Sequence, residues 1–422
     1  MLKAKIHSYI FYYTLAFGIL TIPFSILFQL PVILILLINF MVESNWKEKF
    51  LNIRKNSLLP FFILFSGFYL LYVIGTFYSS NLRYAFSDLE CKLFLFLMPF
   101  FIFTQKKEDF TKEKINNLFF LFIIAVLAMI ICNFSISAFN FAKNGNKDSF
   151  FYTQLSHFSH PSYSALYANT AFLFALHFLF INPVKEKILK ILFAATILLT
   201  AAYIFFVQSK AGVIIFTICA LASAIHIINL RKRRLIVTSC FITLCSLLLV
   251  LISKYTPVMT RMQDALQAIK TETSVSNPYN GTTVRLTLWK TAWQTGCEHI
   301  ISGVGTGDVK DTLIGQYKER GYKYITEKQF NAHNQYLQTF VALGIIGLMT
   351  LIAALTYPLL QSLRLKHYIA AIWWFSIICN PLVECMFEVR AGCDFIATFG
   401  CLLCYYVSAF DRPAPRLLQT QP

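Results

Sequence analysis

Charged residues are scarce in this chain, and their scarcity excludes a soluble globular protein. Asp, Glu, Lys and Arg make up 14% of the sequence, whereas a soluble domain carries about 25%. Hydrophobic residues make up 57%, and the mean hydropathy is +0.60. An aqueous globule of 422 residues cannot hide that much apolar surface, so the solvent around most of the chain is lipid.

Acidic residues are fewer than basic residues. The sequence has 20 Asp and Glu against 37 Lys and Arg, which gives a formal net charge of +17. Such a balance is compatible with a nucleic-acid partner, but the basic residues lie between apolar runs and form no continuous stripe. Nucleic acid is therefore rejected as a partner. In a membrane protein, basic residues set the orientation instead.

Metal-binding patterns are also lacking. The 11 cysteines form no paired CxxC motifs, and most lie in apolar runs, where they behave as small hydrophobic residues. Asp308 and Asp311 do not form the D-x-D pair of a metal-dependent sugar transferase. We therefore expect no metal and no other cofactor. Cys297, Cys385 and Cys393 lie outside the runs or near their ends, and a disulfide among them stays open.

Apolar runs of the length that a membrane span needs, about 20 residues, recur along the whole chain. We expect one all-α transmembrane domain over residues 1–422, a polytopic helical bundle of about twelve spans. The N-terminal stretch has no small-residue cleavage site and is expected to be a retained first helix. The spans are placed near residues 7–22, 25–42, 58–78, 84–104, 115–137, 161–181, 188–207, 211–230, 235–253, 333–360, 367–382 and 391–410.

The distribution of basic residues predicts the orientation. With a cytoplasmic N-terminus, every inner segment holds at least two Lys or Arg. The short outer loops hold only Arg83, Lys143, Lys147, Lys210 and Arg390. This bias follows the positive-inside rule, and it predicts twelve spans with both termini in the cytoplasm.

One outer loop is long, covering residues 254–332 between the ninth and tenth spans. Its segment 261–270, "RMQDALQAIK", has an amphipathic helical pattern. Further on, Leu286, Trp289 and Trp293 recur at helical spacing and form an apolar stripe. This stripe is expected either to lie flat on the membrane or to pack against the spans.

Three residues on the outer side are candidates for chemistry. Lys210 stands between two apolar runs, where it is either a lysine that extends to the interface or a cation for a phosphate. Arg285 is either a solvated loop arginine or a fork that binds phosphate through two hydrogen bonds. His333 opens the run "HNQYLQTFVALGIIGL", as an interfacial residue or as a group that accepts a hydroxyl proton.

Other polar residues near these positions have two interpretations each. Asn334 and Gln338 either bind sugar hydroxyls or satisfy backbone groups at a helix start. Glu384 and Glu388 lie four residues apart, on one face if the stretch is helical. An ion-pair network with Arg390 is favoured over catalysis for them.

Two further motifs have mainly structural interpretations. His160, in "SHFSHPSYSALYAN", precedes a proline and is mainly expected to be a helix-start residue. The glycines of "ISGVGTGDVKDTL" are typical of a tight turn with close backbone approach, because no strand precedes them as in a nucleotide fingerprint.

The order of three motifs resembles the O-antigen ligase and O-antigen polymerase superfamily. They are "VRLTLWKTAW", "GVGTGD" and "HNQYLQTFVALGIIGL", followed by an outer turn with "NP…E…E…AG". The resemblance covers roughly residues 208–395. It implies a membrane-embedded, metal-independent, inverting glycosyltransferase that takes a glycan from undecaprenyl diphosphate at the periplasmic face of the bacterial inner membrane.

The resemblance also assigns roles to residues and partners. The family's essential histidine corresponds to His333 and its loop arginine to Arg285. Another family arginine corresponds to Lys210. The lysine has the same charge but lacks the paired guanidinium donors of an arginine. A ligase transfers the glycan to a hydroxyl of the lipid A–core, whereas a polymerase transfers it to another lipid-linked repeat. A transporter of lipid-linked glycans without chemistry is the alternative from another class.

Overall fold

The computed structural model describes residues 2–230 and 281–410, and in this part of the chain the regular secondary structure is all helical, with no strand. Short 3₁₀ turns (η1, Ile26–Phe28; η2, Lys147–Phe150; η4, Asn380–Leu382) and one π turn (η3, His177–Ile181) connect or extend the helices. The α-helices are α1 (Leu2–Thr21), α2 (Gln29–Glu43), α3 (Trp46–Lys55), α4 (Leu59–Phe77), α5 (Leu82–Phe103), α6 (Lys112–Asn144), α7 (Tyr152–Leu155), α8 (Pro161–Leu176), α9 (Lys187–Val207), α10 (Lys210–Leu230), α13 (Gly281–Glu298), α14 (Val309–Glu319), α15 (Lys323–Lys328), α16 (Gln335–Arg364), α17 (Tyr368–Cys379) and α18 (Arg390–Phe410).

Eight helical segments in the described residues are long and apolar enough to cross a membrane. The chain is therefore a multi-pass membrane protein, as its composition predicts. These segments are Ile26–Glu43, Leu59–Phe77, Lys112–Asn144, Pro161–Ile181, Lys187–Val207, Lys210–Ile227, Gln335–Arg364 and Arg390–Phe410.

The expected count of twelve spans is reached only in part. The expected runs 7–22, 84–104 and 367–382 are helical but are not among the eight. The second of them forms α5, whose Asp88, Glu90 and Lys92 interrupt the apolar sequence. The third is the short helix Tyr368–Leu382. The run 235–253 and the amphipathic segment 261–270 lie outside the described residues.

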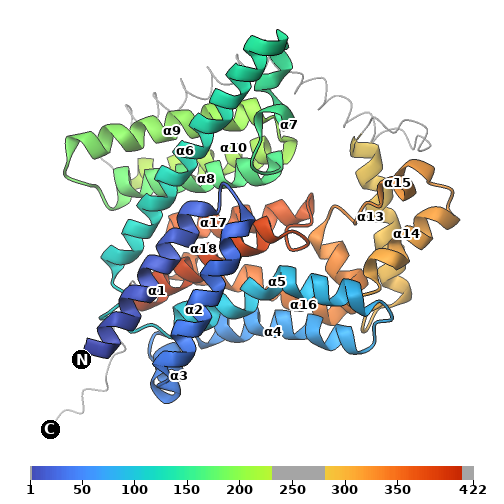
Figure 1. The fold of residues 1–422 in the computed structure, drawn as a ribbon, viewed down its shortest axis with the longest axis horizontal. Helices are drawn as coiled ribbons and strands as arrows, with labels where there is room; N and C mark the ends of the chain where they lie inside the picture. The colour runs from blue at the N-terminus through green and yellow to red at the C-terminus, as the bar shows by residue number, and fades with distance from the viewer. Residues whose placement is uncertain (1, 231–280, 411–422) are drawn as a thin grey trace.

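The helices pack in two groups that meet at α17 and α18 (Figure 1). In one group α4 packs against α5 and α16, and α5 packs against α18. In the other, α8 packs against α6 and α9, and α10 packs against α17. Helices α13, α14 and α15 lie together at one end of the molecule, while α3 and the start of α1 lie at the opposite end (Figure 1).

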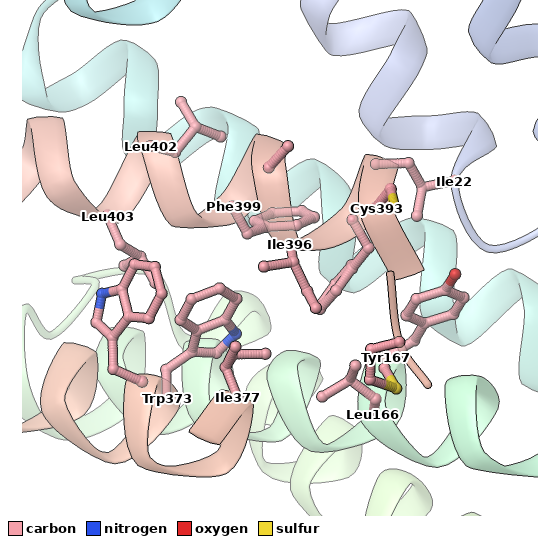
Figure 2. Close-up of a cluster of buried hydrophobic side chains, with 14 of the residues drawn as sticks. Ile22, Leu166, Tyr167, Trp373, Ile377, Cys393, Ile396, Phe399, Leu402 and Leu403 are labelled. Atoms are coloured by element: carbon pink, nitrogen blue, oxygen red, sulfur yellow. The ribbon is translucent and has the colours of Figure 1, made fainter. Parts of the chain in front are cut away.

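Helix α18 lies inside the bundle, with neighbours on all sides. Figure 2 shows its Ile396 on the side of α18 that faces Tyr167 of α8 and Trp373 of α17, while Leu402 points to the opposite side. A helix with apolar residues on every face suits such all-round burial, and α18 buries Asp394 and Thr398 along with its apolar side chains. The Tyr167 hydroxyl also donates to the Ala391 carbonyl over 2.9 Å, which fixes the start of α18 against α8. The segment that precedes α18 is thereby held at a defined place.

Helix α16 is interrupted by Gly344, whose φ of 64° and ψ of −159° are not helical. The amide of Ile345 donates to the Ile300 carbonyl over 2.7 Å instead of to its own helix. The glycine-rich loop fills the break, because Val304 N and Gly305 N donate to carbonyls at positions 341 and 342, each over 2.9 Å. A Cβ on Gly303 would lie 2.4 Å from the Ala342 carbonyl carbon. The loop is thus a tight turn that packs against the backbone of α16, and its amides at Val304 and Gly305 donate to protein carbonyls.

The two acidic residues after this loop have a structural role. The Asp308 carboxylate accepts hydrogen bonds from the amides of Ser80 (2.8 Å) and Asn81 (2.7 Å), just before α5 begins. Asp311 accepts from the Asn81 side chain over 2.7 Å. These contacts fix the loop to the start of α5. Cys297, Cys385 and Cys393 are free thiols.

Candidate functional site

A cavity of about 410 Å³ lies where the starts of α8, α10 and α16 meet α13 and the segment after α17. Charged and polar side chains line much of it, together with a few apolar ones. The lining residues are Tyr152, His160, Ser162, Gln208, Ser209, Lys210, Ala211, Gly281, Thr282, Val284, Arg285, Phe330, His333, Asn380, Val383 and Glu384. The structure therefore brings Lys210, Arg285 and His333 to one cavity from three separate helices or helix starts.

Lys210 is the first residue of α10, after a tight turn from α9. Gln208 makes this turn in the left-handed region, with φ of 52°, and Ser209 Oγ accepts the Gly212 amide over 3.2 Å. The Lys210 ammonium lies 3.4 Å from Thr282 Oγ1 at the start of α13. The lysine thus spans the cavity wall between α10 and α13.

Arg285 projects from α13 toward the segment after α17. Its Nη2 lies 3.6 Å from Glu384 Oε2, in an ion pair whose side chains are 33% and 13% exposed. This separation is longer than a hydrogen bond. The guanidinium is therefore loosely paired and keeps donors for another anion.

His333 is held by its neighbours in a backbone conformation that non-glycine residues rarely adopt, with φ of 45°. Its amide donates to Asn331 Oδ1 over 3.0 Å, and its carbonyl accepts from Trp289 Nε1 over 3.3 Å. Its ring lies edge-on to Phe330, with centroids 5.4 Å apart. Such strained residues persist only where the surrounding structure determines them, and they cluster at functional sites.

Glu384 connects the histidine to the arginine. Its Oε1 lies 3.2 Å from His333 Nδ1, and its Oε2 faces Arg285. Burial by itself would raise the pKa of Glu384, but the hydrogen bond from His333 and the charges of His333, Arg285 and His160 lower it overall. The carboxylate is therefore ionised and can only accept. His333 Nδ1 must then carry the proton, and in the neutral ring Nε2 is left as an acceptor.

His160 lines the same cavity and caps α8. Its Nδ1 accepts the Ser162 amide over 3.4 Å, so the expected role at a helix start is found. Burial lowers the pKa of His160, the nearby Glu384 opposes this, and Arg285 and His333 add to the lowering. At neutral pH this imidazole is therefore uncharged.

The comparison with known families addresses the part of the chain that carries Lys210, Arg285 and His333. Residues 195–352 match the O-antigen ligase family model. The resemblance seen in the sequence motifs is thereby confirmed for this region. No curated protein matches the chain.

The matched O-antigen ligase region ends before Glu384. The place of this carboxylate in the cavity comes from the structure. A glutamate in a loop gives no sequence signal for a partner 51 residues away, and the sequence points to Arg390 instead. Tyr152, Phe330 and Asn380 also line the cavity without being singled out in the sequence.

Two of the amides beside the histidine serve the backbone. Asn334 Oδ1 accepts the Leu337 amide over 3.1 Å and caps α16, while its Nδ2 donates to the Leu382 carbonyl over 3.0 Å. Gln338 Oε1 accepts the Ala332 amide over 3.1 Å. Neither residue lines the cavity. Of the two interpretations of these residues, the structure therefore favours helix-start bonding over contact with sugar.

The expected grouping of Glu384, Glu388 and Arg390 is wrong. The stretch between Leu382 and Arg390 is not helical, so the two glutamates do not share a helix face. Glu388 pairs with Lys92 at 3.0 Å, and Arg390 lies 3.9 Å from Glu90 and 4.0 Å from Asp394. An irregular loop sends the neighbouring charges to different partners, and only Glu384 lines the cavity.

Proposed function

We propose that this protein is an O-antigen-ligase-like glycosyltransferase. It transfers a glycan from undecaprenyl diphosphate to a hydroxyl of the lipid A–core, with inversion and without a metal ion. The observation that carries the proposal is the convergence of Lys210, Arg285 and His333 on one cavity. The O-antigen ligase match over residues 195–352 supports the same class of reaction.

The two cations suit the leaving group. A diphosphate gains negative charge as its bond to the anomeric carbon breaks, and fixed cations in a poorly hydrated site stabilise that charge. Arg285 contributes a planar fork and Lys210 a compact ammonium. In the described residues, no three His, Cys, Asp or Glu side chains group in a way that could hold a metal ion, and metal independence stays a prediction.

His333 suits the incoming hydroxyl. With its Nδ1 proton directed to Glu384, Nε2 accepts the proton of the acceptor hydroxyl as the oxygen attacks. General base catalysis of this kind contributes about 10²- to 10⁴-fold. A single attack on the carbon face opposite the departing diphosphate inverts the anomeric centre. In this scheme, the ionised Glu384 fixes the ring and stabilises the imidazolium that forms.

The orientation is part of the proposal. The charge bias of the loops supports cytoplasmic termini, and the cavity then faces the periplasm. We treat the chain as one transmembrane domain in the bacterial inner membrane, with residues 254–332 as its periplasmic loop. In the described part of this loop, α13 packs against α16, and it carries Arg285 to the cavity.

A polysaccharide polymerase would use the same residues with another acceptor. A transporter is the alternative without chemistry, and a glycine-broken helix such as α16 occurs in transporters. In this chain, however, the break at Gly344 is filled by the 300–305 loop, and Gly344 does not line the cavity. This arrangement favours catalysis over transport.

Purified protein with a synthetic polyprenyl-diphosphate-linked repeat separates these functions. We expect product only when a lipid A–core acceptor is added, and none with His333→Ala. Chains that lengthen without that acceptor would indicate a polymerase. Transfer at the wild-type rate by a folded His333→Ala protein would overturn the assignment of His333 as the general base, and no transfer by the wild-type protein with either acceptor would overturn the enzymatic proposal.

A further inference from the structure

Asp88, Lys92 and Glu388 form a buried cluster of charges, and none of the three lines the cavity. Lys92 of α5 has no exposed side-chain surface, and it bonds to Asp88 and, over 3.0 Å, to Glu388. The two carboxylates are 5% and 7% exposed. Ionisable side chains are costly within a membrane bundle, and where they occur they generally serve a function. The reaction proposed above uses none of these three residues directly.

The cluster is connected to both halves of the His333–Glu384 pair. Gln335 is the first residue of α16, two positions after His333, and its Nε2 donates to Glu388 Oε1 over 3.3 Å. Its Oε1 accepts the Phe387 amide over 2.7 Å. The segment that carries Glu384 is therefore bonded to the start of α16 by a side-chain bridge, and Lys92 holds the carboxylate at the end of that bridge.

Lys92 also contacts a second support of α16. Its ammonium lies 4.5 Å from the centroid of the Tyr72 ring on α4, a separation at which a cation is attracted to the ring face. The Tyr72 hydroxyl lies 3.2 Å from Thr339 Oγ1, one turn into α16. The lysine thereby connects α4, α5, the start of α16 and the 384–388 segment.

We propose that Lys92 is a positioning residue, which acts through Glu388 and Gln335 to set the geometry of the His333–Glu384 hydrogen bond. The expected effect on transfer rests on the proposed function, whereas the expected change in the His333–Glu384 hydrogen bond does not. A misplacement of about 1 Å caused by a change far from the reacting atoms lowers rates as much as a hundredfold. The distance between the two residues of the pair depends on how two chain segments are held together, and this cluster joins them in addition to the Asn334–Leu382 hydrogen bond.

The test compares Lys92→Met with Lys49→Met. Lys49 is a matched control, because it is also a buried lysine in an ion pair, with Glu43 at 3.0 Å. It belongs to α3, which lies at the end of the molecule opposite to α13, α14 and α15 (Figure 1). The readout is the ¹⁵N-histidine spectrum of the protein in nanodiscs, in which a His333→Gln sample identifies the His333 Nδ1–H signal. Transfer kinetics are measured on the same samples.

We expect Lys92→Met to shift or remove the His333 signal and to lower kcat about ten- to a hundredfold, with the donor KM within about threefold because neither cavity cation changes. Lys49→Met should alter neither readout. The variant Lys92→Met/Glu388→Gln keeps the net charge of the cluster and provides a folded sample if the single variant is unstable. An unchanged His333 signal in either folded variant would overturn the inference.

The same samples separate failure of this inference from failure of the proposed function. Loss of the His333 signal in Lys92→Met, together with no transfer by the wild-type protein, would support the positioning role and refute the glycosyltransferase. Normal transfer by wild type and by both folded Lys92 variants would refute the positioning role and leave the glycosyltransferase intact.

Discussion

Replacing Glu384 with glutamine removes one charge from the cavity and keeps the shape of the side chain. The wild-type carboxylate accepts a hydrogen bond from His333 Nδ1 at 3.2 Å with only 13% of the Glu384 side chain exposed. A hydrogen bond to a charged group contributes about 1.5–3 kcal/mol. If this contribution is realised in the transition state, kcat falls about 10- to 150-fold, since each 1.36 kcal/mol is tenfold in rate.

The same substitution has an opposite effect on the donor. Glu384 lies 3.6 Å from Arg285, so removing the carboxylate charge leaves the guanidinium charge uncompensated and free to attract a diphosphate. We therefore expect the donor KM to stay constant or fall while kcat drops. The assay is steady-state transfer with the donor varied at saturating acceptor. Glu319→Gln, on the exposed surface of α14, is the control. An unchanged kcat, or a raised donor KM as the only effect, would show that Glu384 does not act through His333.

Three further predictions concern the cavity and its supports. Lys210→Arg should retain transfer and Lys210→Ala should lose most of it, because the charge matters more than the side-chain shape; equal activities in the two variants would argue against a phosphate role. Gly344→Ala should lower the thermal midpoint more than Gly145→Ala, since both glycines have φ of 64° but only the former would place a Cβ 2.3 Å from a backbone oxygen, that of Ile301; equal shifts would contradict this packing. The pKa of Glu384 in the folded protein lies below the ordinary value of 4.5. The ionised carboxylate therefore stabilises the fold above about pH 4.5, and this contribution is lost as the pH falls through the lowered pKa. The thermal midpoints of wild type and Glu384→Gln should then converge on acidification, and a constant difference between them would count against the pairing of Glu384 with His333 and Arg285.

Much of the fold follows from local sequence, because a span needs only a long apolar run and its own backbone hydrogen bonds. The runs near 58–78, 115–137 and 188–207 correspond to α4, α6 and α9. The run at 367–382 is shorter than a span needs and forms α17 with a 3₁₀ turn. Composition alone does not determine how such a segment sits among its neighbours.

The candidate site was predictable where residue type and motif order were informative. Lys210, Arg285 and His333 are named from the sequence, and the structure brings them to one cavity. The partner of Glu384 was not predictable, since an irregular loop turns neighbouring charges toward different helices. In the sequence Lys92 is only an interruption of an apolar run, because its partner Glu388 lies 296 positions away in the chain.

The location of a bound donor would show whether Arg285 and Lys210 hold the departing diphosphate. A structure of the protein with a polyprenyl-diphosphate-linked sugar would show where the diphosphate binds. We expect phosphate oxygens within hydrogen-bonding distance of Arg285 and Lys210, and the anomeric carbon on the side of the cavity that His333 lines. A diphosphate bound away from these two cations, or one separated from His333 by another helix, would contradict this expectation.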